Sequence, residues 1–107
     1  MSCRVEYTDE AKADLEGFNE SPRRIIRKLI DRVAENPLPK NEGGYGEPLG
    51  NRGGNDLTGL CRIKLLKPGV RVIYKAVRTD GIMKIIVIAA RADGEAYALA
   101  AARRADK

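Results

Sequence analysis

The sequence predicts a small α+β sandwich, a single domain over residues 1–107 with the element order β-α-α-β-β-β-α. Two patterns carry this prediction. The N-terminal part has apolar residues at helical spacing, whereas residues 60–90 hold apolar runs separated by turn residues. A chain of 107 residues is long enough for one domain with its own core. We therefore expect an antiparallel meander sheet, two N-terminal helices packed on one of its faces, and a short C-terminal helix.

A strand and a short helix are expected at the start of the chain. Ser2–Tyr7 alternates as a strand does and places on one face Cys3, Val5 and Tyr7. Thr8 is typical of a helix N-cap, and the two acidic residues after it favour the positive end of a helix. The buried stripe of this helix is expected to be Ala11, Leu15 and Phe18.

A second, strongly amphipathic helix is expected next. Ser21 and Pro22 are typical of a cap and a first helical residue, and Asn36 and Pro37 end the helix. Its apolar arc contains Ile25, Ile26, Leu29, Ile30 and Val33. Its opposite arc is rich in cations, which are Arg23, Arg24, Arg27, Lys28 and Arg32. This arc is either a solvated face or a surface that docks onto RNA or an acidic partner.

The segment at about 37–57 is expected to be a glycine-rich loop. Residues 37–56 have no hydrophobic period and contain six glycines and three prolines. Too little chain remains on either side for a linker between domains. Structureless loops of this length are uncommon and often functional. The loop either folds over a ligand or is mobile.

Residues 60–77 are expected to form a β-hairpin. Pro68 and Gly69 are typical of the central residues of a type II turn, which would place Lys64 opposite Ile73. One face of the hairpin then carries Arg62, Lys64, Arg71 and Lys75. The other face carries Ile63, Leu65, Val72 and Tyr74. Strand cations commonly face water, but four like charges on one patch repel one another, and an anionic ligand would relieve that repulsion.

A strand and a helix complete the predicted fold. Thr79–Gly81 is a second turn, and Ile82–Ala90 is apolar on both faces, as in the middle of a sheet. Asp93 is expected to cap a helix over Gly94–Arg104.

The histidine and cysteine counts exclude several kinds of catalytic and metal site, and the net charge favours one kind of partner. The chain has no histidine and only two cysteines, Cys3 and Cys61, which excludes the usual zinc sites and every nucleophile activated by histidine. We expect no cofactor and no metal, reduced thiols, and a core-filling role for Cys61. The net charge of +5 suits a polyanionic partner. The longest apolar run, Ile85–Ala90, is too short to cross a bilayer, so we expect a cytoplasmic protein without a membrane partner.

Four segments resemble a known family. They are PLG at 48–50, NDLTGL at 55–60, RIKLLKPGVRVIYK at 62–75 and AARADGEAY at 89–97. In order and spacing they closely resemble RelE-type bacterial toxins of the RelE/ParE superfamily. The resemblance implies the toxin of a type II toxin–antitoxin system, a ribosome-dependent endoribonuclease that cleaves mRNA in the ribosomal A site. It also implies three partners, namely a cognate antitoxin, the ribosome and mRNA.

The resemblance carries over to individual residues. The residues that match the family in type are Lys64, Arg71, Arg91 and Tyr97. Arg62 stands where the best-known members have a lysine, and a guanidinium almost never gives up its proton. The expected RNA-binding residues are Arg62, Lys64, Arg71 and Lys75.

These groups suit a reaction that needs no metal, in which the RNA 2′-OH attacks the adjacent phosphate. Like charges around Lys64 favour its neutral amine, so Lys64 is the candidate base. Arg71 and Arg91 are candidate phosphate clamps, and Arg91 also favours the leaving group. Tyr97 is a candidate for stacking on a base.

Other interpretations remain open. A ParE-like toxin shares the expected fold but inhibits DNA gyrase without cutting RNA, and a degenerate toxin survives as a binding module. Tyr97 is alternatively a helix side chain half-buried against the sheet, and Arg91 alternatively pairs with a carboxylate such as Glu95. An acidic antitoxin segment is expected either to cover Arg62, Lys64 and Arg71, or to displace the C-terminal helix, or to act by bulk alone.

Overall fold

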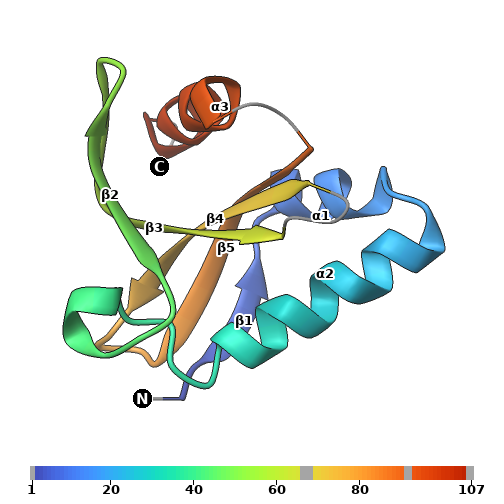
Figure 1. Ribbon diagram of the computed structural model, residues 1–107, viewed down its shortest axis with the longest axis horizontal. Helices are drawn as coiled ribbons and strands as arrows, with labels where there is room; N and C mark the ends of the chain where they lie inside the picture. The colour runs from blue at the N-terminus through green and yellow to red at the C-terminus, as the bar shows by residue number, and fades with distance from the viewer. Residues whose placement is uncertain (1, 66–68, 91–92, 106–107) are drawn as a thin grey trace.

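The computed structural model describes residues 2–65, 69–90 and 93–105. It shows a five-stranded sheet with the strand order β1-β5-β4-β3-β2 and with helices on both faces (Figure 1). The strands are β1 (Arg4–Tyr7), β2 (Glu47–Arg52), β3 (Asn55–Leu65), β4 (Val70–Val77) and β5 (Ile82–Ala89). The helices are α1 (Asp9–Glu16), α2 (Glu20–Val33) and α3 (Asp93–Ala105), with a 3-10 turn η1 (Lys40–Glu42). The predicted α+β sandwich is confirmed.

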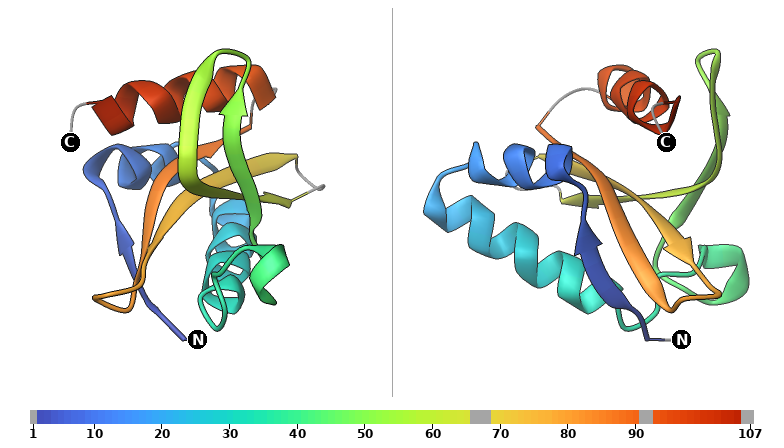
Figure 2. Two further views of the ribbon diagram at one scale, coloured as in Figure 1. Left: turned by 90° about the vertical axis from the view of Figure 1, so that its left-hand side faces the viewer. Right: turned by 180° about the vertical axis from the view of Figure 1, so that it is seen from behind.

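The sheet separates two hydrophobic cores. Helices α1 and α2 cover one face and α3 covers the other, as the two views of Figure 2 show. Alternation along β4 supplies both cores, because Val72 and Tyr74 are buried on the side of α1 and α2 and Ile73 is buried under α3. The expected division of the hairpin into two faces is therefore confirmed.

The sheet is mixed, whereas the sequence analysis expected an antiparallel meander alone. Strands β2 to β5 form the antiparallel meander, but β1 pairs in parallel with β5, with Val5 opposite Met83. Hydrophobic alternation predicts that a strand exists and carries no information on its direction, which is why the parallel pairing was not foreseen. Strand β5 lies between β1 and β4, which confirms that this apolar strand is interior.

The N-terminal helices follow local signals with three corrections. Phe18, expected in the buried stripe of α1, lies beyond its last residue and is half-buried against the same core. Thr8 caps α1 as predicted, because its Oγ1 accepts a hydrogen bond of 3.1 Å from the Ala11 N–H. Helix α2 starts at Glu20 with Asn19 as its N-cap, so Ser21 is not the cap. Pro22 still lies in the first turn, where helix N–H groups have no intrahelical partner. Ile25 is 45% exposed because it lies about 100° around the helix from Ile26, at the edge of the apolar arc.

None of the described helices is long and apolar enough to span a bilayer.

The segment predicted as a loop over residues 37–57 is largely structured, and the prediction was wrong there. It contains η1, strand β2 and the first residues of β3. Leu49 is the one buried side chain among the six residues of β2, so the strand has no apolar alternation in the sequence. Its structure comes from pairing with β3, and a register shift between Pro48 and Gly50 accommodates the proline.

The β3–β4 hairpin has the predicted faces and a different pairing. Lys64 lies opposite Arg71 and Leu65 opposite Val70, a shift of two residues from the predicted register. Because side chains alternate with a period of two, this shift keeps every side chain on its predicted face. Residues 66–69 connect the strands, and a two-residue type II turn matches the twist of paired strands poorly. The predicted turn at Pro68 and Gly69 lies mostly outside the described residues.

Candidate functional site

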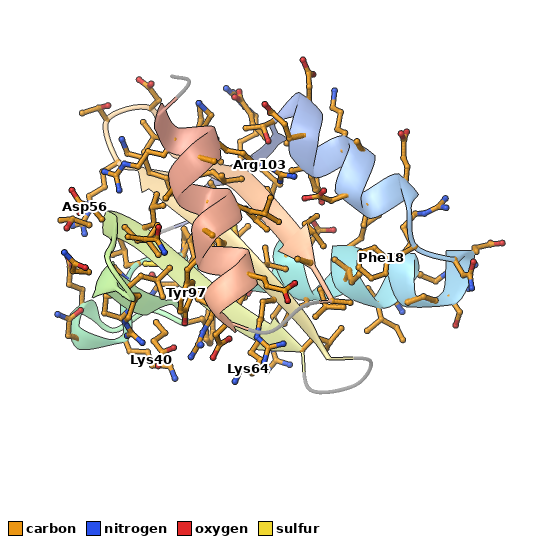
Figure 3. The ribbon with its side chains drawn as sticks, turned by 90° about the horizontal axis from the view of Figure 1, so that it is seen from above. Phe18, Lys40, Asp56, Lys64, Tyr97 and Arg103 are labelled. Carbon is orange, nitrogen blue, oxygen red and sulfur yellow. The ribbon has the colours of Figure 1, made fainter. Side chains whose placement is uncertain are left out.

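Three cations gather where β3 and β4 meet the start of α3. Arg62, Lys64 and Arg71, here called the cationic cluster, share the sheet face on which α3 packs. Lys64 lies directly opposite Arg71, and Arg62 is two residues away along β3. Lys64 is exposed, whereas the side chains of Arg62 and Arg71 are 13% and 21% exposed. Figure 3 shows Lys64 and Tyr97 on the side of the molecule where α3 begins.

Asp93, the first residue of α3, binds both arginines of the cationic cluster. Its carboxylate accepts a hydrogen bond from Arg71 Nε and lies 3.2 Å from Arg62 Nη1. The hydrogen bond from Arg71, with the charges of Arg62, Arg71 and Lys64, lowers the pKa of Asp93 against the opposing effect of burial. The helix begins one residue earlier than predicted, and its first carboxylate occupies the place between two guanidinium groups.

A second carboxylate reaches the cluster from β2. Glu47 lies opposite Arg62 in the β2–β3 pairing and forms an ion pair with it. Arg62 is therefore bound by Glu47, by Asp93 and by the hydroxyl of Tyr97. Among the described residues, two carboxylates contact the cationic cluster, which corrects the expectation of a purely cationic face.

Tyr97 is packed against the sheet. Its side chain is 6% exposed and belongs to the core under α3. Its hydroxyl accepts a hydrogen bond of 2.7 Å from Arg62 Nη1, and Arg52 Cζ lies 6.0 Å from the centre of its ring. This position agrees with the alternative that Tyr97 is a helix side chain packed against the sheet. For the ring to stack on an RNA base, α3 would have to move.

The remaining expected residues lie elsewhere. Lys75 shares the sheet face of the cluster but pairs with Leu60, about 13 Å along β3 from Lys64. Lys75 is exposed and lines a small cavity together with Arg103 and Arg104 near the end of α3. It is therefore not part of the cationic cluster. Arg91 lies outside the described residues.

Sequence reasoning missed Glu47 and Arg52, and it assigned Asp93 only a capping role. Both missed residues belong to β2, which was predicted as a loop, so no strand pairing was available to place them. The β2–β3 register identifies Glu47, because it places this carboxylate directly opposite the guanidinium group of Arg62 on the neighbouring strand.

The arrangement suits the binding of a phosphate group. Guanidinium groups form two parallel hydrogen bonds to carboxylates and phosphates alike, so the position of Asp93 between Arg62 and Arg71 marks where an anion binds. A phosphate would have to replace Asp93 there. The exposed amine of Lys64 and the carboxylates of Glu47 and Asp93 are the groups at hand for proton transfer.

The fold is similar to that of solved toxins. One similar structure is a variant of the Escherichia coli toxin RelE in the free state, in which two arginines are replaced by alanine. It is 19% identical to this chain and matches with a TM-score of 0.74 over 97% of this chain and 98% of that chain. The toxin–antitoxin complex RelBE2 from Mycobacterium tuberculosis matches with a TM-score of 0.67 and 18% identity over 85% of this chain and 100% of that chain.

The intact E. coli RelBE toxin–antitoxin complex matches with a TM-score of 0.61 and 17% identity over 81% of this chain and 94% of that chain. No model of a protein family matches the sequence. No curated protein matches it either. The structural likeness shows that this chain has the fold of these solved RelE structures.

Proposed function

We propose that this chain, which has the RelE/ParE toxin fold, is the toxin of a type II toxin–antitoxin pair and cleaves mRNA in the ribosomal A site. The observation that carries the proposal is the cationic cluster at the start of α3, in which two guanidinium groups already hold a carboxylate. The ribosome and its mRNA are then the substrate complex, and the cytoplasm is the place of action.

The proposed reaction is attack of the RNA 2′-OH on the adjacent phosphate. The 2′ oxygen forms a bond to phosphorus while the bond to the 5′ oxygen of the next nucleotide breaks, leaving a 2′,3′-cyclic phosphate and a 5′-OH. Arg62 and Arg71 stabilise the charge on the phosphate, and Lys64 accepts the proton of the 2′-OH. The leaving 5′ oxygen takes up a proton from water to give the 5′-OH. The resemblance adds Arg91 as a second clamp that favours the leaving group.

The proposed protein partner is a cognate antitoxin. Three of the similar solved structures are complexes of a toxin with an antitoxin or an antitoxin peptide, which supports this assignment. The chain has a net charge of +5, so an acidic, initially disordered segment suits it. Such a segment would compete with Asp93 for the arginines or pull α3 away from the sheet.

A binding-only toxin is the second candidate. One observation favours it, because Arg62 replaces the family's lysine and is already held by Glu47 and Asp93. In that case the chain arrests growth without cutting RNA. A gyrase-binding toxin of the ParE type belongs to the same class.

Induced expression tests the proposal in cells. We expect growth arrest and new mRNA 5′ ends within codons, whereas purified RNA without ribosomes stays intact. Lys64→Ala and Arg71→Ala should abolish both effects, and Lys75→Ala is the matched control because this lysine shares the sheet face but not the cluster. Growth arrest with intact mRNA would favour the second candidate, and inhibition of supercoiling by the purified chain would identify gyrase as its target.

A further inference from the structure

A groove of about 440 Å³ adjoins the cationic cluster on the side of α2. Strand β2 pairs with β3 only as far as Arg62. The groove is lined beyond that point by residues of β3, of the end of α2, of η1 and of the segment after η1. Figure 1 shows how these elements are arranged. Arg62 and Lys64 line one end of the groove. Figure 3 shows Lys40, another lining residue, on the same side of the molecule as Lys64.

Tyr45 presents an exposed aromatic ring in this groove. It is 48% exposed, one of two large hydrophobic residues exposed in the described part of the chain, and the other, Ile25, does not line the groove. Tyr97, by contrast, has its ring covered and its hydroxyl occupied. Tyr45 therefore offers the flat surface that Tyr97 lacks.

The backbone under Tyr45 is firmly held. The Tyr45 N–H donates to Asn36 O over 3.2 Å, the Gly46 N–H to Leu38 O over 3.1 Å, and the Lys40 N–H to Gly46 O over 2.7 Å. A Cβ at Gly46 would overlap the Tyr74 hydroxyl, so the chain approaches the sheet there as closely as only glycine permits. Because this backbone is already ordered, little backbone entropy is lost when a ligand binds at Tyr45.

The charge of the groove favours an anion. In the described part of the chain, its charged lining consists of Arg32, Lys40, Arg62, Lys64 and a single carboxylate, that of Glu47, which is paired with Arg62. Its apolar lining comes from Leu29, Val33 and Ile63. Cations around an aromatic surface are the features that recognise single-stranded nucleic acid, because the phosphates are neutralised and a base stacks on the ring.

We propose that this groove binds the nucleotide next to the scissile phosphate, with its base stacked on Tyr45 and its phosphate held by Lys40 and Arg32. The inference rests on the proposed function and names a further subsite of the same RNA. Tyr45 then determines base preference at that nucleotide, whereas the cationic cluster acts on the phosphate that is cut.

Two assays test the groove. The first measures the affinity of a fluorescent single-stranded RNA hexanucleotide with a 2′-O-methyl group at the cleavage position, and the second measures cleavage of ribosome-bound mRNA. Tyr45→Ala should weaken RNA binding about tenfold, because it removes the ring on which a base stacks. Tyr45→Phe should bind like wild type, and Ile25→Ala is the control for loss of an exposed apolar side chain outside the groove.

Each outcome decides the inference. Loss of affinity in Tyr45→Ala, together with a changed base preference in the cleaved codon and rescue by Tyr45→Phe, supports it. If wild type cuts ribosomal mRNA and Tyr45→Ala has wild-type affinity and preference, the subsite is overturned while the proposed function stands. If wild type neither cuts nor binds RNA, both the proposed subsite and the proposed function are contradicted. If Tyr45→Ala loses affinity only for a polyglutamate peptide, the groove belongs to an acidic protein segment and the inference is overturned.

Discussion

Arg71 on β4 and Asp93 at the start of α3 form an ion pair that ties the sheet to the C-terminal helix at the centre of the candidate site. The same carboxylate lies 3.2 Å from Arg62 Nη1. In the resting protein the arginines proposed to bind RNA therefore hold an internal anion. Binding of a phosphate and release of this carboxylate are coupled, because both compete for the same donors.

Replacing this carboxylate should strengthen anion binding. Asp93→Asn keeps the size of the side chain but removes its charge, so a phosphate no longer competes with a carboxylate. We expect the RNA hexanucleotide to bind several-fold more tightly, measured by fluorescence anisotropy at low salt. Asp9→Asn removes the same charge from the first residue of α1, away from the cluster, and is the matched control. Equal effects of the two variants would show that only net charge matters.

The same variant gives a pH dependence of stability. The pKa of Asp93 is lowered in the folded state, so the ion pair stabilises the fold above the ordinary carboxyl pKa of about 3.9. This contribution disappears as the pH falls through the lowered folded-state value. The free energy of unfolding of wild type should exceed that of Asp93→Asn by a constant amount at neutral pH, and the difference should shrink below about pH 4. Urea titrations over this range measure it, and a pH-independent difference would contradict the argument.

Arg103 and Asp14 connect α3 to α1 through a largely buried ion pair. Arg103 Nη1 donates to Asp14 Oδ2 and to the Ile86 carbonyl over 2.7 Å each, and the Ile88 N–H donates to Asp14 Oδ2. Arg103→Ala leaves the Asp14 carboxylate without its cation, which should lower the free energy of unfolding by about 3 kcal/mol. Arg24→Ala breaks an exposed pair with Glu20 and should cost less than about 1 kcal/mol in the same urea titration. Equal costs for the two variants would contradict this assignment.

Gly46 should tolerate no side chain. A Cβ there would overlap the Tyr74 hydroxyl and lie 2.9 Å from Cys61 Cβ, both on the sheet. Gly46→Ala should therefore lower the free energy of unfolding by about 1–3 kcal/mol, measured by thermal or urea unfolding. Gly94→Ala is the control, because a Cβ at Gly94 in α3 lies within 4 Å of no atom of the described residues and alanine favours a helix. A Gly46→Ala variant as stable as wild type would show that the chain around residue 46 can move away from the sheet without loss of stability.

Side-chain alternation was the most informative part of the sequence. It placed Arg62, Lys64 and Arg71 on one face, and that placement holds although the pairing differs by two residues. Faces depend only on the parity of the register, whereas partners depend on the length of the connecting turn. The apolar strand in the middle of the sheet and the Thr8 cap were likewise predictable from local signals.

The parts that escaped prediction depend on contacts between distant segments. Strand β2 has one buried side chain and is stabilised by pairing with β3, so its sequence alone indicates a loop. Glu47 could not be placed without that pairing. Asp93 has the sequence signature of a helix start, but its role as a ligand of Arg62 and Arg71 follows from where α3 docks. The depth of Tyr97 is set by the same docking.

Cleavage of a defined A-site codon by the purified protein tests the central claim most directly. With ribosomes programmed by one mRNA, we expect wild type to cut within the codon and to leave a 2′,3′-cyclic phosphate and a 5′-OH. Arg71→Ala should react about 100-fold more slowly or worse, as for loss of a group that stabilises transition-state charge, while Lys75→Ala should react like wild type. Intact mRNA with wild type, or cutting that is indifferent to Arg71→Ala and Lys64→Ala, would contradict the account.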